Sequence, residues 1–282
     1  MNYIVLSGVS GGMGMATAKK LIEAGFHVFG LDIKKPQEQP EGLTFIETDI
    51  RDSVSINNAL LKVKEETNEI DAIVSMAGIN DVNSLLEISE EDFIKIFDIN
   101  VFGAYRLNKA FVSLLKERGK VIIISSELAP LDPLPYIGLY AITKSTLDKY
   151  AYSLRMELQL LNKQVVVIRP GAVNTPILEA SAKRIDEYSQ ETELYKYNAS
   201  KFRDVTNSVQ SKNIPPEKIG KLVLKILKKK KPKYTYHINR NFGLMVLNAM
   251  PQRFQNWIIK KILKAKNNSL NRVFFNFVML AH

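Results

Sequence analysis

Tyr140 and Lys144 place a phenol and an ammonium group four residues apart, in the segment Gly-Leu-Tyr-Ala-Ile-Thr-Lys at 138–144. On a helix this spacing puts both side chains on one face. A unit positive charge about 5 Å from a phenol, at an effective dielectric constant near 20, contributes roughly 3 kcal/mol, or about 2 pKa units. The pair therefore predicts a tyrosine that acts as an acid or a base near neutral pH. Because Tyr and Lys are common on helices, the alternative is a pair without chemical function.

The elements that must position this pair follow from hydrophobic periodicity and turn residues. Short β-type runs alternate with longer helical patterns from the start of the chain. The predicted strands span 3–7, 27–31, 43–48, 70–75, 120–125 and 164–169, and the predicted helices span 12–24, 53–67, 90–117 and 138–161. This alternation predicts an α/β fold, a Rossmann-type, doubly wound parallel β-sheet flanked by helices. Such sheets bind ligands at the carboxyl ends of their strands.

Length and composition limit the possibilities further. The 282 residues, 46% of them hydrophobic, are enough for one large core. The chain has no cysteine and three histidines, so thiolate chemistry is excluded and no metal site is expected. The N-terminus lacks a signal-peptide pattern, and no apolar run approaches the ~20 residues of a membrane-spanning helix. We therefore expect a cytoplasmic protein with one main domain, residues 1–238, and a C-terminal helical extension, residues 239–282.

A glycine-rich run follows the first predicted strand and opens the first predicted helix. Glycines allow a tight turn, and the exposed N–H groups of a helix N-terminus favour the pyrophosphate of a dinucleotide. The run predicts cofactor contacts from Gly8, Ser10, Gly11, Gly12, Met13 and Gly14. The alternative is a plain turn between a strand and a helix.

Asp32 ends the second predicted strand, eighteen residues after Gly14. A carboxylate at this place bonds the adenine-ribose hydroxyls of NAD and repels the 2′-phosphate of NADP. Lys34 and Lys35 follow and would weaken that discrimination. We expect NAD as the cofactor, with NADP as the alternative; a solvated turn residue is the other interpretation of Asp32.

The glycines, Asp32, Asn100, Ser126, Tyr140 and Lys144, in this order, resemble the short-chain dehydrogenase/reductase family over residues 1 to about 180. The glycines fit both the G-x-x-x-G-x-G of its compact branch and the G-x-x-G-x-x-G of its epimerase-like branch. The short length, the run Arg-Pro-Gly-Ala-Val-Asn-Thr at 169–175, and Asp-Ile-Asn-Val-Phe-Gly at 98–103 favour the compact branch.

The resemblance implies a role for each matching residue. Tyr140 would be the acid/base, and Lys144 would lower its pKa and hold the nicotinamide ribose. Ser126 would orient the substrate oxygen, and Asn100 would hold a water that links Lys144 to solvent. The further cofactor contacts that the resemblance implies are Asp49, Ile50, Ala77, Gly78, Pro170, Gly171, Val173 and Thr175. Each residue also has an ordinary structural interpretation as a strand-end, turn or helix-capping residue.

Three features depart from the family pattern. Ser7 replaces the usual threonine, and Ser75-Met76 stands where the family has two asparagines before Ala-Gly, so an amide that braces the sheet is missing. Ser126 precedes Tyr140 by fourteen residues, one more than usual, and three prolines lie between them. This longer loop makes Ser126 the weakest of the four assignments.

The implied reaction is reversible hydride transfer between a nicotinamide and a secondary alcohol or ketone. Apolar residues beside the site suggest a lipophilic substrate of steroid, retinoid, long-chain or sphingoid type. The candidate substrate contacts come from the segment 127–137 and the loop 176–214, namely Leu128, Leu134, Tyr136, Ile177 and Leu178. Two other classes of function stay open, a non-catalytic dinucleotide-binding sensor or scaffold and an epimerase or dehydratase that retains its NAD.

The C-terminal part of the chain carries the positive charge. Residues 221–282 hold fourteen Lys and Arg and no Asp or Glu, whereas the net charge of the whole chain is +10. The tail resembles the extensions of hydroxysteroid and retinol dehydrogenase-like members, with a strand at 233–237 before paired basic, apolar helices. In 251–266 an apolar stripe is expected from Phe254, Trp257, Ile258, Ile262 and Ala265. Such a helix suits an anionic membrane surface, so 240–266 is a candidate for peripheral association. Packing on the body or on a second subunit is the alternative.

A homodimer or homotetramer is expected through the helix at 138–161, and nucleic acid is not expected as a partner.

Overall fold

The computed structural model describes residues 1–208 and 213–264. Within these residues, seven parallel strands form one sheet in the order β3-β2-β1-β4-β5-β6-β7. The strands span Asn2–Ser7 (β1), Phe26–Asp32 (β2), Leu43–Glu47 (β3), Ile70–Ser75 (β4), Leu115–Ile124 (β5), Gln164–Pro170 (β6) and Thr235–Ile238 (β7). From β1 the strand order runs outward in one direction to β3 and in the other from β4 to β7. Sheets of this type bind ligands at the point between β1 and β4, where the order reverses. The predicted doubly wound parallel sheet is confirmed.

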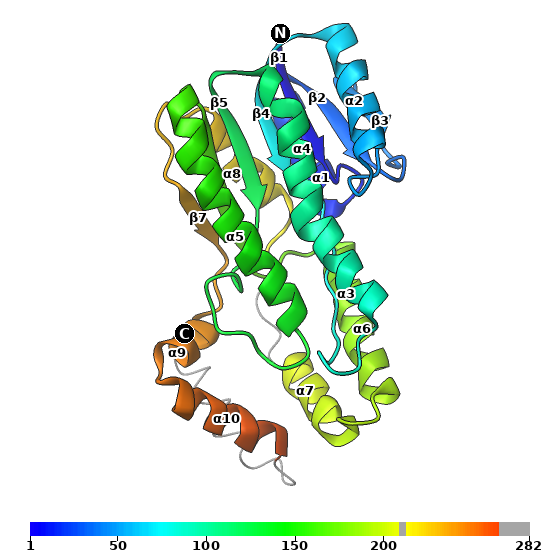
Figure 1. Ribbon diagram of the computed structural model, residues 1–282, viewed down its shortest axis with the longest axis vertical. Coiled ribbons are helices and arrows are strands. Elements are labelled where there is room, and N and C mark those ends of the chain that lie inside the picture. Colours follow the sequence, from blue (N-terminus) through cyan, green and yellow to red (C-terminus); the bar gives the residue numbers. More distant parts are fainter. Residues whose placement is uncertain (209–212, 265–282) are drawn as a thin grey trace.

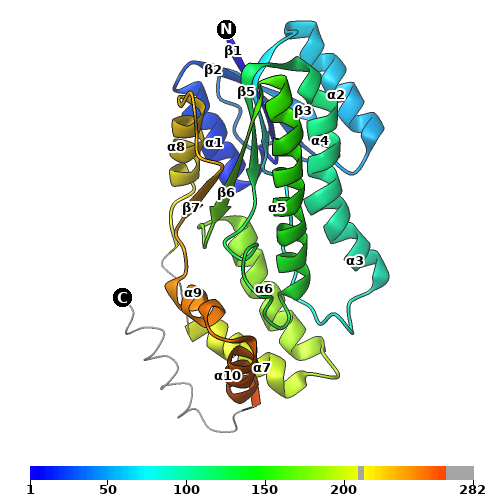
Figure 2. The same cartoon turned by 60° about the vertical axis from the view of Figure 1, so that its left-hand side comes forward.

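Helices cover both faces of this sheet. Their bounds are Gly12–Ile22 (α1), Ser53–Glu66 (α2), Glu90–Phe97 (α3), Gly103–Phe111 (α4), Gly138–Leu158 (α5), Pro176–Glu191 (α6), Lys196–Ser208 (α7), Glu217–Leu227 (α8), Phe242–Ala249 (α9) and Gln252–Lys264 (α10). Figure 2 shows α1 and α8 on one face of the sheet and α2, α4 and α5 on the other. The helices α6, α7, α9 and α10 lie beyond the carboxyl ends of the strands (Figure 1).

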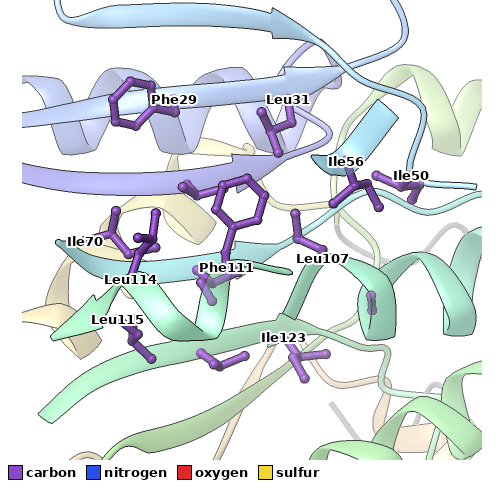
Figure 3. Packing of buried hydrophobic residues seen from close by; sticks show 14 of the residues in the cluster. Phe29, Leu31, Ile50, Ile56, Ile70, Leu107, Phe111, Leu114, Leu115 and Ile123 are labelled. Atoms are coloured by element: carbon purple, nitrogen blue, oxygen red, sulfur yellow. The ribbon is translucent and has the colours of Figure 1, made fainter. Parts of the chain in front are cut away.

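Apolar side chains fill both faces of the sheet. Figure 3 shows the layer under α2, α4 and α5, in which Phe29 of β2 and Phe111 of α4 have no exposed surface. Ile4 and Leu6 of β1 belong to the opposite layer, which packs against α1 and α8. Alternate residues of one strand thus enter two cores, which is why the strands are almost continuously apolar in sequence.

The segment 90–117, predicted to contain helices, holds α3 and α4. A π-helical turn, Asp98–Phe102, separates α3 from α4, and a 3₁₀ turn at Val112–Leu114 ends the helical stretch. Strand β5 then begins at Leu115, earlier than the predicted 120–125, with an irregular register against β4. The prediction fails here because the polar run 116–118 has no strand pattern, and Arg118 takes a positive φ of 59°. The helix predicted over 138–161 ends at Leu158, and a 3₁₀ turn follows.

The described part of the C-terminal extension packs on the body. Asn248 of α9 accepts a hydrogen bond from the Asp132 N–H at 2.7 Å, and the buried Gln255 side chain of α10 bonds to Asp132 Oδ2 at 3.2 Å. Asn198 of α7 donates to the Leu263 carbonyl at 2.8 Å. Among the described residues no helix is long and apolar enough to cross a bilayer. The division of the chain at 238/239 into two units stays a prediction.

The single apolar stripe predicted for 251–266 is divided in the structure. Ile258 is buried, whereas Phe254 and Trp257 are 48% and 53% exposed. The two aromatic rings stack on each other at 5.5 Å between centroids, and the Lys261 ammonium lies 5.9 Å from the Trp257 ring centre. The helix thus has an inner aliphatic face and an outer aromatic and basic face. Ala265, the last member of the predicted stripe, lies outside the described residues.

Candidate active site

Tyr140, Lys144 and Ser126 meet at the carboxyl end of β5. Tyr140 and Lys144 occupy the first two turns of α5, and Ser126 follows the end of β5 by two residues. The Lys144 side chain is buried, its Nζ donates to the Ile124 carbonyl at 3.2 Å, and it lies 5.7 Å from the Tyr140 ring centre. The Ser126 hydroxyl is within hydrogen-bonding reach of the Tyr140 phenol. The residues predicted to carry the chemistry are therefore brought together.

Burial controls the protonation of this pair. Loss of hydration raises the pKa of Tyr140 to about 12, against the hydrogen bond from Ser126, which lowers it. The same loss lowers the pKa of Lys144 to about 8, against the attraction of Asp148, which raises it. The expectation of a Tyr140 pKa near neutrality is wrong for the protein alone, because desolvation outweighs the hydrogen bond from Ser126. Tyr140 is held as a neutral phenol, which suits a proton donor.

The Asn100 amide links the loop after β4 to α5. It lies in the π-helical turn, where its Oδ1 accepts from the Ile79 N–H at 2.8 Å and its Nδ2 donates to the Ile79 carbonyl at 2.9 Å. Nδ2 also donates to the Thr143 hydroxyl at 3.1 Å, next to Lys144. The side chain thus fixes the backbone of this loop. The predicted water held by Asn100 stays a prediction.

Gly78 lies beside the Asn100 amide oxygen and the Lys144 ammonium group. A Cβ at this position would lie 3.1 Å from Asn100 Oδ1 and 3.4 Å from Lys144 Nζ. A larger residue would push against both groups. The close backbone approach expected from Ala77 and Gly78 is thus a requirement of the site itself.

The missing asparagine side chain after β4 has a replacement. Ser7 Oγ accepts from the N–H groups of Met76 and Ala77 at 3.2 and 3.3 Å. Ser75 Oγ bonds to Asn108 Oδ1 of α4 at 3.2 Å. Two serine hydroxyls therefore brace the β4 loop where the family pattern uses an amide.

The glycine run meets strict steric demands at two positions. Gly8 has a φ of +76°, and a Cβ on Gly14 would lie 1.9 Å from the Gly8 carbonyl oxygen. A Cβ on Gly12 would lie 3.1 Å from the Thr175 side chain, whereas on Gly11 it would meet only ordinary contacts, 3.4 Å from the Gly8 oxygen. The packing therefore favours the Gly8, Gly12 and Gly14 pattern of the compact branch over the alternative spacing.

The run also fits the pyrophosphate of a dinucleotide. Helix α1 begins at Gly12, and no side chain caps the N–H groups of its first turn. Free N–H groups and the helix dipole at such an end favour a phosphate. Asp32 Oδ2 accepts from the Ser10 N–H at 3.0 Å, which places the carboxylate against the same loop. Ser10 Oγ in turn bonds to the Lys34 carbonyl, and the Lys34 side chain is exposed.

Two of the residues expected to contact the adenine have other partners. Asp49 pairs with Arg51 at 2.7 Å, and the hydrogen bond from Arg51 holds the Asp49 pKa below its usual value. Ile50 is buried against Gly103, where an added Cβ would lie 2.5 Å from Ile50 Cδ1. Ile50 thus belongs to the apolar core, although it flanks the β3 end of the sheet.

The segment after β6 forms one wall of the site. The Gly171 N–H donates to the Ile238 carbonyl at 2.9 Å, and a Cβ on Gly171 would lie 1.9 Å from the Asn239 carbonyl oxygen. Thr175 precedes α6 without capping it, because its hydroxyl bonds back to the Val173 carbonyl at 3.3 Å. The ordinary interpretation of Thr175 as a side-chain helix cap therefore does not hold.

A cavity of about 430 Å³ opens beside Ser126 and Tyr140. Met13, Pro170, Gly171, Val173 and Thr175 line it together with four of the predicted substrate contacts, Leu128, Leu134, Ile177 and Leu178. The fifth, Tyr136, packs away from it with a φ of 67°, and its ring lies 5.2 Å from that of Tyr188 and 5.3 Å from that of Phe202. Tyr136 supports the wall behind Phe202 instead.

Much of the cavity wall comes from residues that were not predicted to contact the substrate. Helices α6 and α7 contribute Ile185, Phe202 and Val205, and the C-terminal extension contributes Leu244, Leu247, Ile259, Ile262 and Leu263. Apolar spacing marks 259, 262 and 263 as one helix face, but it does not show what this face covers. Glu127, directly after Ser126, also lines the cavity and was not predicted.

Both the sequence and the fold of this chain are similar to those of known proteins. The sequence profile described as short chain dehydrogenase matches residues 2–186. The chain belongs to the short-chain dehydrogenase family. A solved short chain dehydrogenase family protein from Francisella tularensis superimposes with a TM-score of 0.72 at 23% identity, covering 87% of this chain and 99% of that one.

Two curated relatives also match most of the chain. A 3-ketodihydrosphingosine reductase of Bacteroides thetaiotaomicron is 27% identical over 234 residues, 82% of this chain and 85% of that protein. An NADPH-dependent 3-dehydrocapnine reductase of Ornithobacterium rhinotracheale is 26% identical over 281 residues, 94% and 98% of the two chains. The protein is thus an NAD(P)-dependent oxidoreductase for substrates of alcohol or ketone type. The hydroxysteroid-like character of the tail and the pairing of subunits stay predictions.

The glycine run gives a matched pair of test variants. Gly14→Ala forces the backbone apart at the Gly8 oxygen, so we expect it to lower stability by about 1–3 kcal/mol and to weaken NADH binding strongly. Gly11→Ala is the control, because Gly11 has an ordinary φ of −74° and open surroundings. Urea unfolding and titration of NADH fluorescence measure both effects. Equal stability and binding in the two variants would contradict the steric interpretation.

Proposed function

We propose that this protein is a reductase of long-chain, lipophilic ketones, working reversibly on the corresponding secondary alcohols. The observation that carries the proposal is the apolar cavity beside the Tyr140 phenol, which is lined by leucines and isoleucines of four segments. Its volume, about 430 Å³, lies in the range of small-molecule sites. The names of the two curated relatives, which denote reductases of sphingosine and capnine precursors, support the same class.

The chain's own residues provide the proton and hold the carbonyl group. Tyr140 donates its phenolic proton to the substrate oxygen, and the Ser126 hydroxyl donates a hydrogen bond to the same oxygen. Lys144, held by the Ile124 carbonyl, stabilises the phenolate that Tyr140 becomes. The nicotinamide dinucleotide, when bound between the glycine run and the 170–175 segment, supplies the hydride that the carbonyl carbon receives. In the product, the carbon carries this hydride and the oxygen carries the proton of Tyr140.

Removal of one hydroxyl tests the proton donor. Tyr140→Phe keeps the ring and its packing but has no proton to give, so we expect kcat to fall roughly a hundredfold or more with NADH binding nearly unchanged. The control is Tyr152→Phe, on the same helix but exposed to solvent. Steady-state rates on a long-chain ketone and calorimetric titration of NADH are the measurements. Turnover retained by Tyr140→Phe would refute the assignment.

Asp32 supports NAD as the preferred cofactor, although one curated relative is named as NADPH-dependent. The carboxylate lies against the glycine run, where it accepts ribose hydroxyls and repels a 2′-phosphate. We expect Asp32→Ala to shift the ratio of NADPH to NADH affinity by about tenfold or more toward NADPH. Glu38→Ala, which removes an exposed acid from the same loop, is expected to leave the ratio unchanged. Tighter binding of NADPH than NADH by the unaltered protein would overturn the NAD preference.

The outer face of α10 supports peripheral association with an anionic membrane. Phe254 and Trp257 are exposed next to Lys261, and Arg253, Lys260 and Lys264 are exposed on the same helix. Aromatic rings enter the interface region, and each basic residue near the surface adds about 1 kcal/mol. The inner face of the same helix lines the cavity, so a membrane-bound protein would hold the cavity wall near its lipid source.

Vesicle binding tests this association. The double variant Phe254→Ala, Trp257→Ala should lower the affinity for vesicles with anionic lipid about tenfold or more, and salt should weaken the binding of the unaltered protein. Leu160→Ala removes an apolar side chain outside α10 that is even more exposed than Phe254 and Trp257, and it is the control. Co-sedimentation gives the affinities. Equal binding by the double variant and the control would dismiss this face.

A further inference from the structure

Glu127 is a carboxylic acid among side chains that are mostly apolar. It directly follows Ser126, and its side chain lines the cavity. Among the described residues that line the cavity, it is the one side chain with a formal charge at neutral pH. A carboxylate on an apolar wall loses hydration and needs a compensating partner.

The contacts within the protein account for part of this compensation. Glu127 Oε2 accepts a hydrogen bond from the Asn241 N–H at 2.6 Å. Its other oxygen, Oε1, lies beside Gly171, where an added Cβ would approach it to 2.9 Å. Burial raises the pKa of Glu127, and the Asn241 N–H and the charge of Arg240 lower it by less. A glutamine would satisfy the Asn241 N–H equally well, so this contact alone does not explain a charged group.

Glu127 also lies close to the reacting groups. Its negative charge contributes to the raised pKa of Tyr140. When Tyr140 donates its proton, the resulting phenolate and the Glu127 carboxylate repel each other. A positive group of the substrate placed at Glu127 would cancel this repulsion during proton transfer.

We propose that Glu127 binds an ammonium group on the carbon next to the substrate carbonyl, so that the substrates are long-chain amino-ketones. This assignment rests on the proposed reductase function and deepens it. Ser126 and Tyr140 are proposed to hold the carbonyl oxygen, and Glu127 lines the same cavity close enough for its charge to act on Tyr140, which suits a cation beside the carbonyl group. The alkyl chain occupies the apolar part of the cavity toward Leu244 and Ile262.

Two ketones of equal chain length test the assignment. One carries an ammonium group on the carbon next to the carbonyl, and the other carries a hydroxyl group there. The assay is run at about pH 6.5, below the ordinary pKa of α-amino groups. The quantity measured is the ratio of kcat/KM for the amino-ketone to kcat/KM for the hydroxy-ketone. We expect Glu127→Gln to lower this ratio roughly 30-fold or more, because it removes one partner of a buried charge pair.

A second variant, Asp132→Ala, distinguishes recognition of the substrate's charge from an indirect effect of a displaced C-terminal extension. Glu127→Gln keeps an acceptor for the Asn241 N–H, and melting and NADH binding report whether its fold and cofactor site persist. Asp132→Ala removes a different contact to the tail, the one with Gln255, without altering the charge in the cavity. We expect it to leave the ratio unchanged.

The outcomes separate this assignment from the proposed function. If the unaltered protein reduces both ketones but Glu127→Gln leaves the ratio within about threefold, the ammonium site is wrong and the reductase function stands. An equal fall of the ratio in Asp132→Ala also overturns it, because tail positioning then explains the effect. If the unaltered protein reduces neither ketone, the proposed function fails and the ammonium site fails with it.

Discussion

The buried Lys144 ammonium is the group on which the rest of the site depends. Removing this charge from water is costly, and the Ile124 carbonyl and the charge of Asp148 offset only part of the cost. The result is a lysine with a pKa of about 8 next to a tyrosine with a pKa of about 12. Burial thus disfavours both the Lys144 ammonium and the Tyr140 phenolate, so the pKa of each group is shifted in the direction that favours its neutral form.

The elements around Lys144 explain several features that look unrelated in the sequence. A side chain at Gly78 would crowd the Asn100 amide oxygen, at 3.1 Å from an added Cβ, and would contact the Lys144 ammonium. The π-helical turn places the Asn100 amide where it can bond the loop after β4 and Thr143 of α5 at the same time. The serines at positions 7 and 75 hold that loop from its other side. The loop is thus fixed by hydrogen bonds from three directions, which keeps both the cofactor loop and the proton donor in place.

Local patterns identify the residues of the proposed chemistry, whereas features that depend on distant partners could not be predicted from the sequence. Four-residue helical spacing identifies Tyr140 and Lys144, and the strand-to-helix context identifies the glycine run. The pKa of Tyr140 depends on burial, which spacing does not report. Asp49 has an arginine two residues away, and this local partner occupies its carboxylate. The Tyr136 ring packs outside the cavity, against the aromatic rings of residues 188, 195 and 202, which come more than fifty residues later in the chain. Glu127 belongs to no motif, so only the cavity reveals it.

Different parts of the chain provide the proposed reacting groups and much of the apolar cavity wall. The residues proposed to carry proton transfer and the glycine run lie within 2–186, the range matched by the family profile. Residues after 186, in α7, α9 and α10, contribute a further part of the apolar wall. The two parts are joined at Glu127 and Asp132, which bond the backbone of Asn241 and the side chains of Asn248 and Gln255. Because Glu127 directly follows Ser126, its contact with the tail lies next to the hydroxyl proposed to orient the substrate. We therefore expect a change in the tail to alter substrate selection more than it alters the positions of Tyr140 and Lys144 on α5.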